Sequence, residues 1–136
     1  MKFRVVKRIN PLNKEESKYY AAPFYMEDLS VIDLAKDISD ACTLNVADVE
    51  AVLTSLVRKL PVYLKSGFKI QLGTFGRVKM SFSSKGSVDP KTVDASSITD
   101  KRIIFTPSQE IKNEIEKTSF TKISLAGDVD VTGTEG

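Results

Sequence analysis

The first two apolar segments of the chain predict β-strands. Residues 2–9 (KFRVVKRI) and 18–25 (KYYAAPFY) are rich in β-branched and aromatic side chains, and a polar stretch that begins at Asn10 and Pro11 separates them. This pattern indicates a β-hairpin or two short strands. Pro23 favours an edge position for the second strand, because proline has no N–H group to donate to a neighbouring strand.

Two apolar stripes with helical spacing follow. Ser30 begins the first helix, where Asp33 reinforces the N-terminus, and Asn45 caps the second helix. Pro61 is expected to kink the second helix, and Gly67 to end it as a C′ glycine. The first stripe consists of Val31, Leu34, Ala35, Ile38, Ala41 and Cys42, and the second of Val49, Val52, Leu53, Leu56, Leu60, Tyr63 and Leu64.

A glycine-containing turn joins the next two predicted strands. Residues 68–72 and 77–82 alternate between apolar and polar side chains, so residues 73–76 (GTFG) between them must turn tightly, with glycine where positive φ is needed. Residues 83–99 are polar and weakly patterned, and an excursion of this length is usually functional or mobile. A strand resumes over residues 102–105.

The last apolar pattern predicts a short helix. Residues 106–109 (TPSQ) have the spacing of a capping box with Pro107 at the first helical position. Ile111 and Ile115 give this helix an apolar edge. The segment from Ser124 onwards contains glycine and acidic residues, and it is expected to be mobile unless something pairs with it.

Composition restricts the chemistry that the chain can perform. The 136 residues are 41% hydrophobic and 28% charged, which suits one soluble domain with small extensions. The chain has no histidine, and its lone Cys42 is expected to be a buried thiol in a reducing cytoplasm, so the common zinc sites and His-based triads are excluded. No apolar run approaches the ~20 residues that cross a membrane. We therefore predict no enzymatic activity, metal, cofactor, small-molecule substrate or membrane partner.

Four short motifs accompany this order of elements. They are residues 69–72 (KIQL) followed by Phe75-Gly76, residues 85–92 (KGSVDPKT), residues 103–107 (IIFTP) and the helical residues 110–115 (EIKNEI). They resemble, in turn, the VQL-x-x-FG strand and turn, the KG…NPxTG arm tip, the VPxFKPG segment and the last helix of the HU / integration-host-factor family of bacterial histone-like DNA-binding proteins. The resemblance covers about residues 28–117. The N-terminal extension and the glycine-bearing tail are closer to a divergent HU-like subfamily with an extra glycine-rich or Ig-like piece.

The resemblance implies a fold, a partner and a set of contact residues. The fold is α+β: a helical pair, an antiparallel sheet with a protruding β-arm and a short C-terminal helix, intertwined with a second copy as a homodimer. Residues 1–27 form an N-terminal β extension, residues 28–123 the HU-like DNA-binding domain, and residues 124–136 an acidic tail. The partner is duplex DNA in the cytoplasmic nucleoid. The implied DNA-binding residues are Arg4, Lys7, Arg8, Arg77, Lys79, Lys85, Pro90, Lys91, Lys101 and Arg102.

The arm departs from the family pattern. It is only weakly cationic, because Asp89, Asp94 and Asp100 accompany its lysines and arginine. The NPxTG motif has become DPKTV, which places a carboxylate beside Pro90. This proline is either a turn residue or the wedge that the family inserts between base pairs. At the last helix PGK has become PSQ, which removes a lysine from a position where phosphate could bind. Fewer phosphate contacts mean lower affinity and a weaker dependence on salt.

Other charged and aromatic residues also allow two interpretations. The cations of residues 1–20 either protect a strand edge from aggregation or replace the contacts that the arm has lost. Phe75 is expected to plug the core rather than stack on a base. Arg58, Lys59 and Lys65 belong either to solvated surface or to a DNA-facing body.

The sequence thus supports two functional hypotheses. The first is a non-enzymatic, dimeric histone-like protein that binds and bends or compacts duplex DNA with little sequence preference. The alternative is an HU-like structural or protein-interaction module with weak or no DNA binding. The net charge is only +2, so the first hypothesis requires a local basic patch.

Overall fold

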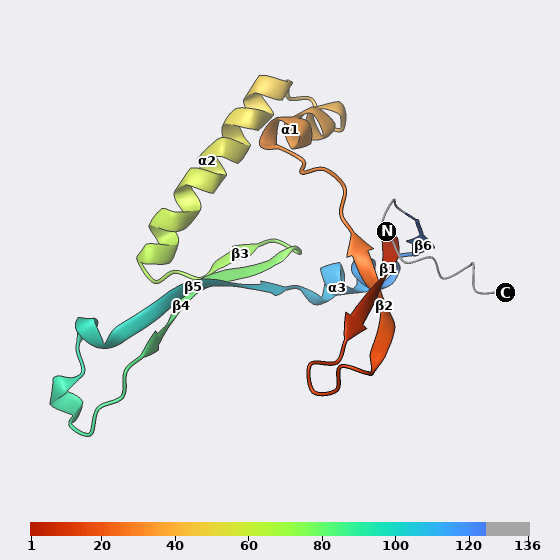
Figure 1. Cartoon of the computed structure of the whole chain (residues 1–136). Helices are drawn as coiled ribbons and strands as arrows, with labels where there is room; N and C mark the ends of the chain where they lie inside the picture. The colour runs from red at the N-terminus through yellow and green to blue at the C-terminus, as the bar shows by residue number, and fades with distance from the viewer. Residues whose placement is uncertain (125–136) are drawn as a thin grey trace. The chain divides into compact units, whose positions relative to one another are not determined.

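The chain is an α+β protein built as two compact units. The computed structural model describes residues 1–124. One unit combines Met1–Asp28 with the segment that begins at Lys117, and the other is Leu29–Glu116 (Figure 1). We call them the hairpin unit and the HU-like unit. The predicted tail falls on residues 124–136, and all of it except Ser124 lies outside the described residues.

The hairpin unit begins with two antiparallel strands, as predicted. Strand β1 (Lys2–Ile9) pairs with β2 (Ser17–Phe24), with Val6 opposite Tyr20 and Arg8 opposite Lys18. Strand β2 lies at the edge of its sheet, which confirms the expected position of Pro23. The strands are joined by a loop that spans residues 10–16.

A third strand comes from the other end of the described chain. Strand β6 (Thr121–Lys122) pairs in parallel with Lys2 and Phe3 of β1, so the strand order is β2-β1-β6. The Ile123 N–H donates to the Phe3 carbonyl oxygen at 2.9 Å and continues this pairing. Residues 117–123, which the sequence interpretation assigned to the HU-like domain, therefore belong to the hairpin unit.

The two predicted helices begin where their caps place them. Helix α1 (Val31–Asp40) has a capping box in which the Asp33 backbone N–H donates to the Ser30 hydroxyl and the Ser30 N–H donates to the Asp33 carboxylate. That backbone donor, with the Ser30 hydroxyl, holds the pKa of Asp33 below its usual value. Helix α2 (Val46–Lys65) begins after Asn45, whose side-chain oxygen accepts from the Asp48 N–H at 2.9 Å, and it continues through Pro61.

The position predicted for Cys42 is wrong. Helix α1 ends at Asp40 with Ala41 as its C-cap, so Cys42 lies in the following turn and is exposed. The predicted apolar stripe extended two residues too far, because Ala41 and Cys42 have the right spacing but lie beyond the last helical residue.

Helix α2 ends in a Schellman motif, as expected for Gly67. This glycine has φ +90°, its N–H donates to the Leu64 carbonyl, and the Phe68 N–H donates to the Tyr63 carbonyl. The rings of Tyr63 and Phe68 meet edge-to-face with their centroids 6.0 Å apart, which is the apolar contact that accompanies this motif. The motif therefore fixes the direction in which the chain leaves α2 and enters the sheet of the same unit.

The sheet of the HU-like unit has the predicted antiparallel strands. Strand β3 (Ile70–Leu72) pairs with β4 (Gly76–Ser84), which pairs with β5 (Ile98–Pro107). Gly73 and Gly76 both have positive φ in the turn, as expected. Gly76 has a second reason to be glycine: a Cβ there would lie 2.5 Å from the Thr106 carbonyl oxygen and 2.7 Å from the Phe105 ring. Strand β5 can pair this closely only because residue 76 has no side chain.

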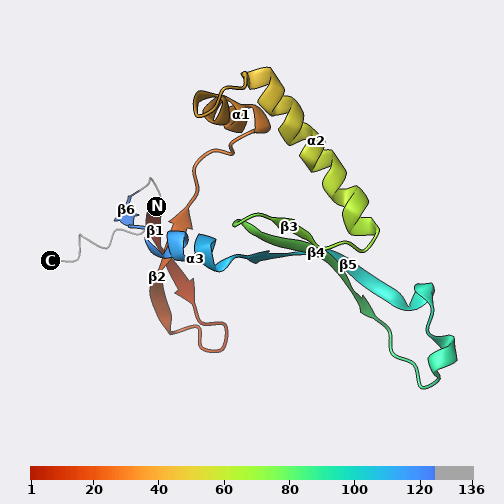
Figure 2. The same ribbon diagram turned by 180° about the vertical axis from the view of Figure 1, so that it is seen from behind.

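The excursion between β4 and β5 is folded. The two strands run out to a tip with two short 3-10 turns, Pro90–Thr92 and Ala95–Ser97 (Figure 2). A β-bulge between Ser81 and Ser83 shifts the register, and Asp100 in the opposing strand has φ +48°. The Lys85 N–H donates to the Ser97 carbonyl at 2.8 Å and closes the base of the tip.

Helix α3 (Gln109–Glu116) begins two residues later than predicted. The Ile111 N–H donates to the Ser108 hydroxyl at 3.2 Å, so Ser108 is the capping residue. Thr106 and Pro107 cannot fill the predicted positions, because both are paired in β5, opposite Arg77 and Gly76.

Candidate nucleic-acid interface

One face of the β3-β4-β5 sheet is cationic. Gln71 lies opposite Arg77, and Arg77 lies opposite Thr106, so alternation places these three side chains on one face together with Lys79. A hollow of about 310 Å³ occupies this face. Its lining consists of Lys69, Gln71, Gly73, Gly76, Arg77, Lys79, Thr106, Pro107 and Ser108. We call this surface the cationic face.

The cationic face has the electrostatics of an anion site. Lys69, Arg77 and Lys79 contribute three positive charges, and no carboxylate is among the lining residues. Gly73 is exposed and nothing lies within 4 Å of its Cβ position, so a phosphate group can approach the backbone of the turn closely there. The opposite face of the same strands carries Ile70, Leu72, Val78, Met80 and Phe105, so the sheet separates an apolar side from a charged side.

Arg102 extends this face toward the arm. It lies opposite Ser81, two residues beyond Lys79 on the same face of β4. Its guanidinium donates to the Ser83 hydroxyl at 3.0 Å and to the Asp100 carbonyl at 3.2 Å, across the bulge. These two bonds hold the charge of Arg102 in place. Lys101, by contrast, lies within the bulge.

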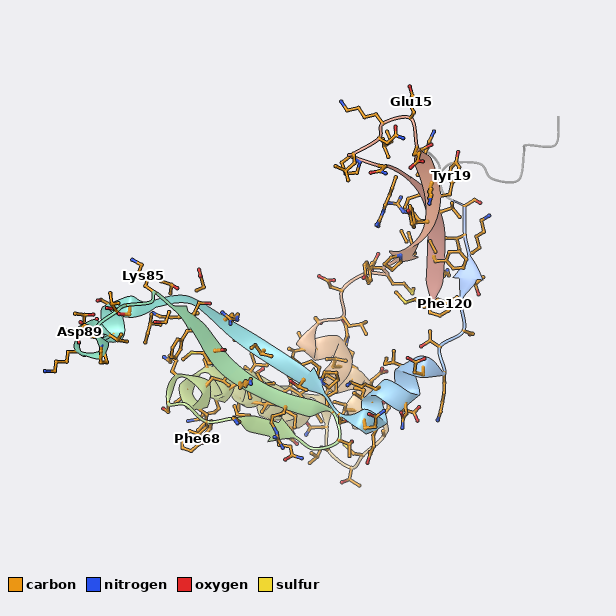
Figure 3. The ribbon with its side chains drawn as sticks, turned by 90° about the horizontal axis from the view of Figure 1, so that it is seen from below. Glu15, Tyr19, Phe68, Lys85, Asp89 and Phe120 are labelled. Atoms are coloured by element: carbon orange, nitrogen blue, oxygen red, sulfur yellow. The ribbon has the colours of Figure 1, made fainter. Side chains whose placement is uncertain are left out.

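The arm tip mixes charges of both signs. Pro90 is the first residue of a 3-10 turn capped by Asp89, whose carboxylate accepts from the Lys91 N–H at 3.0 Å. The Asp94 carboxylate accepts from the hydroxyl and N–H of Ser96, and these bonds lower the pKa of Asp94, so it is ionised at neutral pH. Lys85 and Asp89 are exposed on this arm (Figure 3). The weakly cationic arm expected from the sequence is thus a property of the folded tip.

The cations of the hairpin unit lie on opposite faces. Alternation along β1 places Arg4 and Arg8 on one face, with Lys18 and Tyr20 of β2, and Lys7 on the other. The Arg8 guanidinium carbon lies 5.4 Å from the centroid of the Tyr20 ring, within the range of a cation–π contact. The three implied contact residues of this strand therefore cannot all touch one flat partner.

The structure thus gathers eight of the ten expected contact residues at three places, whereas Lys7 lies on the other face of β1 and Lys101 lies within the bulge. Arg77, Lys79 and Arg102 share the cationic face, Lys85, Pro90 and Lys91 occupy the arm tip, and Arg4 and Arg8 share a face of the hairpin unit. Lys69 belongs to the cationic face and was missed. The sequence shows that Lys69 and Gln71 are two residues apart and share a face, but only the pairing of Gln71 with Arg77 shows that Lys69 lies on the same face as Arg77.

Phe75 packs less deeply than expected. Its ring stacks on Phe105 with the centroids 4.9 Å apart, yet half of its surface remains exposed in the single chain. Within residues 1–124, no group of three His, Cys, Asp or Glu side chains is placed to hold a metal ion. Among the described helices, none combines the length and apolar character that crossing a membrane requires.

Comparison with known proteins gives one family and a common fold. Residues 1–122 match the family described as an HU domain fused to wHTH, Ig or a glycine-rich motif. Integration host factor subunit alpha of Mannheimia succiniciproducens is 25% identical over 92 residues, which cover 66% of this chain and 94% of that protein.

Two solved structures resemble the chain in fold. A cocrystal of Anabaena HU with DNA matches with a TM-score of 0.52 and 16% identity, over 66% of this chain and all of that one. A putative DNA-binding protein from Bacteroides vulgatus matches with a TM-score of 0.56 and 11% identity, over 90% of this chain. This chain spans about half the length of the Bacteroides protein, 48%.

Proposed function

The chain belongs to the family of HU domains fused to wHTH, Ig or a glycine-rich motif, and we propose that it is a non-enzymatic DNA-binding protein of the nucleoid. It binds duplex DNA as a homodimer, with little sequence preference, and bends or compacts it. The HU and integration-host-factor resemblance of the sequence is confirmed by the family match and by the curated relative.

The observation that carries this proposal is the cationic face. Lys69, Arg77 and Lys79 line one hollow without a carboxylate, and the exposed Gly73 of the turn leaves its backbone open on the same hollow. Such a surface suits the phosphate groups of DNA, which attract cations without regard to sequence. Arg102 continues the positive charge toward the arm, where a duplex that follows the face would next make contact.

Titration of a fluorescent duplex at several salt concentrations tests this function. Two copies of the three cations in a dimer would neutralise about six phosphates, so log affinity should fall against log salt with a slope of roughly −5. Duplexes of unrelated sequence should give similar affinities. Binding that is undetectable at low salt, or that does not respond to salt, would contradict the proposal.

The arm tip favours the alternative, an interaction module with little DNA affinity. Asp89 and Asp94 are exposed carboxylates that repel phosphate, and the bonds from Ser96 lower the pKa of Asp94 further. This repulsion is confined to the tip, whereas the cationic face lies on the sheet. The salt titration separates the two functions, because an interaction module would give no salt-dependent affinity.

We expect an obligate dimer. Within residues 1–124 the buried apolar side chains are Ala35, Val49 and Leu64, too few for a stable core. Leu34, Ile38 and Leu56, which belong to the helix stripes, are each more than 40% exposed in the single chain. A second copy would cover them, so the thermal midpoint should rise by a few degrees for each tenfold increase in protein concentration. A folded monomer at micromolar concentration, seen by light scattering, would overturn this expectation.

Pro90→Ala should reduce DNA bending more than DNA affinity. Insertion of an apolar side chain into a base step is energetically separate from charge neutralisation by the sheet. Asp89→Asn keeps the oxygen that accepts from the Lys91 N–H but removes the charge, so it should tighten binding, most clearly at low salt. Energy transfer between the duplex ends measures the bend, with affinity taken in the same buffer. A wild type that binds without bending, or Pro90→Ala that bends the duplex fully, would show that Pro90 is a turn residue.

A further inference from the structure

A second hollow, of about 370 Å³, lies at the loop end of the β1–β2 hairpin, and no residue of the cationic face lines it. It is lined by Arg8, Ile9, Asn10, Pro11, Glu16, Lys18 and Tyr20. A volume of this size suits a small ligand or one unit of a polymer.

Hydrogen bonds shape the loop wall of this hollow. The Asn10 N–H donates to the Glu16 carbonyl at 3.0 Å, and the Asn10 side-chain oxygen accepts from the Leu12 N–H at 3.0 Å. The Asn13 side-chain oxygen accepts from the Glu15 N–H at 3.2 Å in a second turn of the same kind. The wall therefore exists before a ligand arrives.

Two cations face each other across the strands beside this wall. Arg8 and Lys18 are directly opposite in the β1–β2 register, an arrangement that is unfavourable for like charges. An anion between the two side chains would relieve this repulsion. The pairing thus indicates an anionic ligand at this end of the hairpin.

The third component is an aromatic ring on the same face. Tyr20 lines the hollow and is 45% exposed, and the Arg8 guanidinium lies near its ring. Glu16 contributes a carboxylate, which accepts hydrogen bonds and repels phosphate from its side of the hollow. A ring for stacking, a cation pair and a separate acceptor together match the base, the phosphate and the polar base edge of one nucleotide.

We propose that the hollow binds an unpaired nucleotide of single-stranded DNA. The base stacks on Tyr20, the phosphate lies between Arg8 and Lys18, and Glu16 accepts from the base edge. A paired base cannot bind in this way, because its faces are covered by its neighbours in the duplex. The chemistry of the site does not depend on the proposed function. Only the choice of DNA over RNA rests on that function.

The test is anisotropy of a labelled single-stranded oligothymidine with the full chain. An oligonucleotide of the same length with abasic sites keeps the phosphates but has no bases to stack. We expect the abasic strand to bind more weakly, and Tyr20→Ala to weaken oligothymidine binding by roughly five- to 150-fold, the usual effect of one lost stacking contact. Tyr20→Phe retains the ring and should bind like the wild type. A labelled RNA strand of the same length provides the comparison with RNA.

Neighbouring residues on the opposite face provide matched controls. Tyr19 is also about half exposed but lies on the opposite face of β2 from Tyr20, so Tyr19→Ala should leave binding unchanged. Arg8→Gln should reduce the salt slope by up to ~0.7, the value for one phosphate of a single strand, and Lys7→Gln should not. Equal binding of the abasic strand, or equal losses for Tyr19→Ala and Tyr20→Ala, would overturn the proposal. Duplex affinity measured on the same variants reports on the proposed function separately, and Tyr20→Ala should not change it.

Discussion

Gly76→Ala should destabilise the HU-like unit by about 2–4 kcal/mol, the sum of a strained backbone and an overpacked contact. Residue 76 has φ +156°, and its added methyl group would lie 2.5 Å from the Thr106 carbonyl oxygen, which belongs to the backbone and cannot rotate away. The stacked rings of Phe75 and Phe105 would also have to move. The change in free energy should appear in urea unfolding monitored by circular dichroism, and as a midpoint lower by at least ~10 °C.

Gly73→Ala provides the matched control. Gly73 also has positive φ, +53°, but nothing lies within 4 Å of the position that its Cβ would occupy. The cost should therefore be the left-handed conformation alone, about 1–2 kcal/mol. Equal losses for the two variants would show that the close approach of β5 at Gly76 contributes nothing.

Removal of the cationic face should abolish most duplex binding. Replacement of Lys69, Arg77 and Lys79 by glutamine removes three charge-assisted contacts per chain and six per dimer, each of about 1 kcal/mol, so the affinity of the dimer should fall on the order of 10,000-fold. The salt slope should become less steep by up to ~2.7 per chain, since each lost phosphate contact contributes ~0.9. All three side chains are on an exposed sheet face, so the fold should persist.

Two comparisons make this result specific. Replacement of Lys36, Lys112 and Lys122 by glutamine removes the same net charge from elsewhere and should change affinity much less. Replacement of Lys85 and Lys91 measures the arm, where Asp89 and Asp94 already offset their charges. If the arm variant loses as much affinity as the face variant, the sheet is not the principal contact surface.

Local signals in the sequence predicted most helix and turn boundaries. The caps at Ser30 and Asn45 depend on side chains within three residues of each helix start, and the Schellman end at Gly67 depends on one glycine. The start of α3 could not be found in this way, because the pairing of Thr106 and Pro107 with β4 overrides a matching cap pattern.

Long-range pairing decided what could not be predicted. Strand β6 has two residues and pairs with β1 from more than a hundred positions away, so no local pattern marks it. The cationic face needed the β3–β4 register to bring Lys69 beside Arg77, and the hairpin needed the β1–β2 register to bring Arg8 opposite Lys18. Alternation within a strand indicates two faces, whereas the neighbouring strand decides which residues meet on each face.

The parallel pairing of β6 with β1 also determines an order of events during synthesis. The ribosome synthesises β1 and β2 before β6, so their sheet lacks its third strand until Thr121 and Lys122 emerge. The HU-like unit, Leu29–Glu116, is translated in this interval, so this inserted unit can fold before β6 is available to pair with β1. Each nascent chain therefore exposes the β6 side of β1 throughout the synthesis of the inserted unit, and we expect the basic side chains of that strand to limit aggregation at this edge until Thr121 and Lys122 are added.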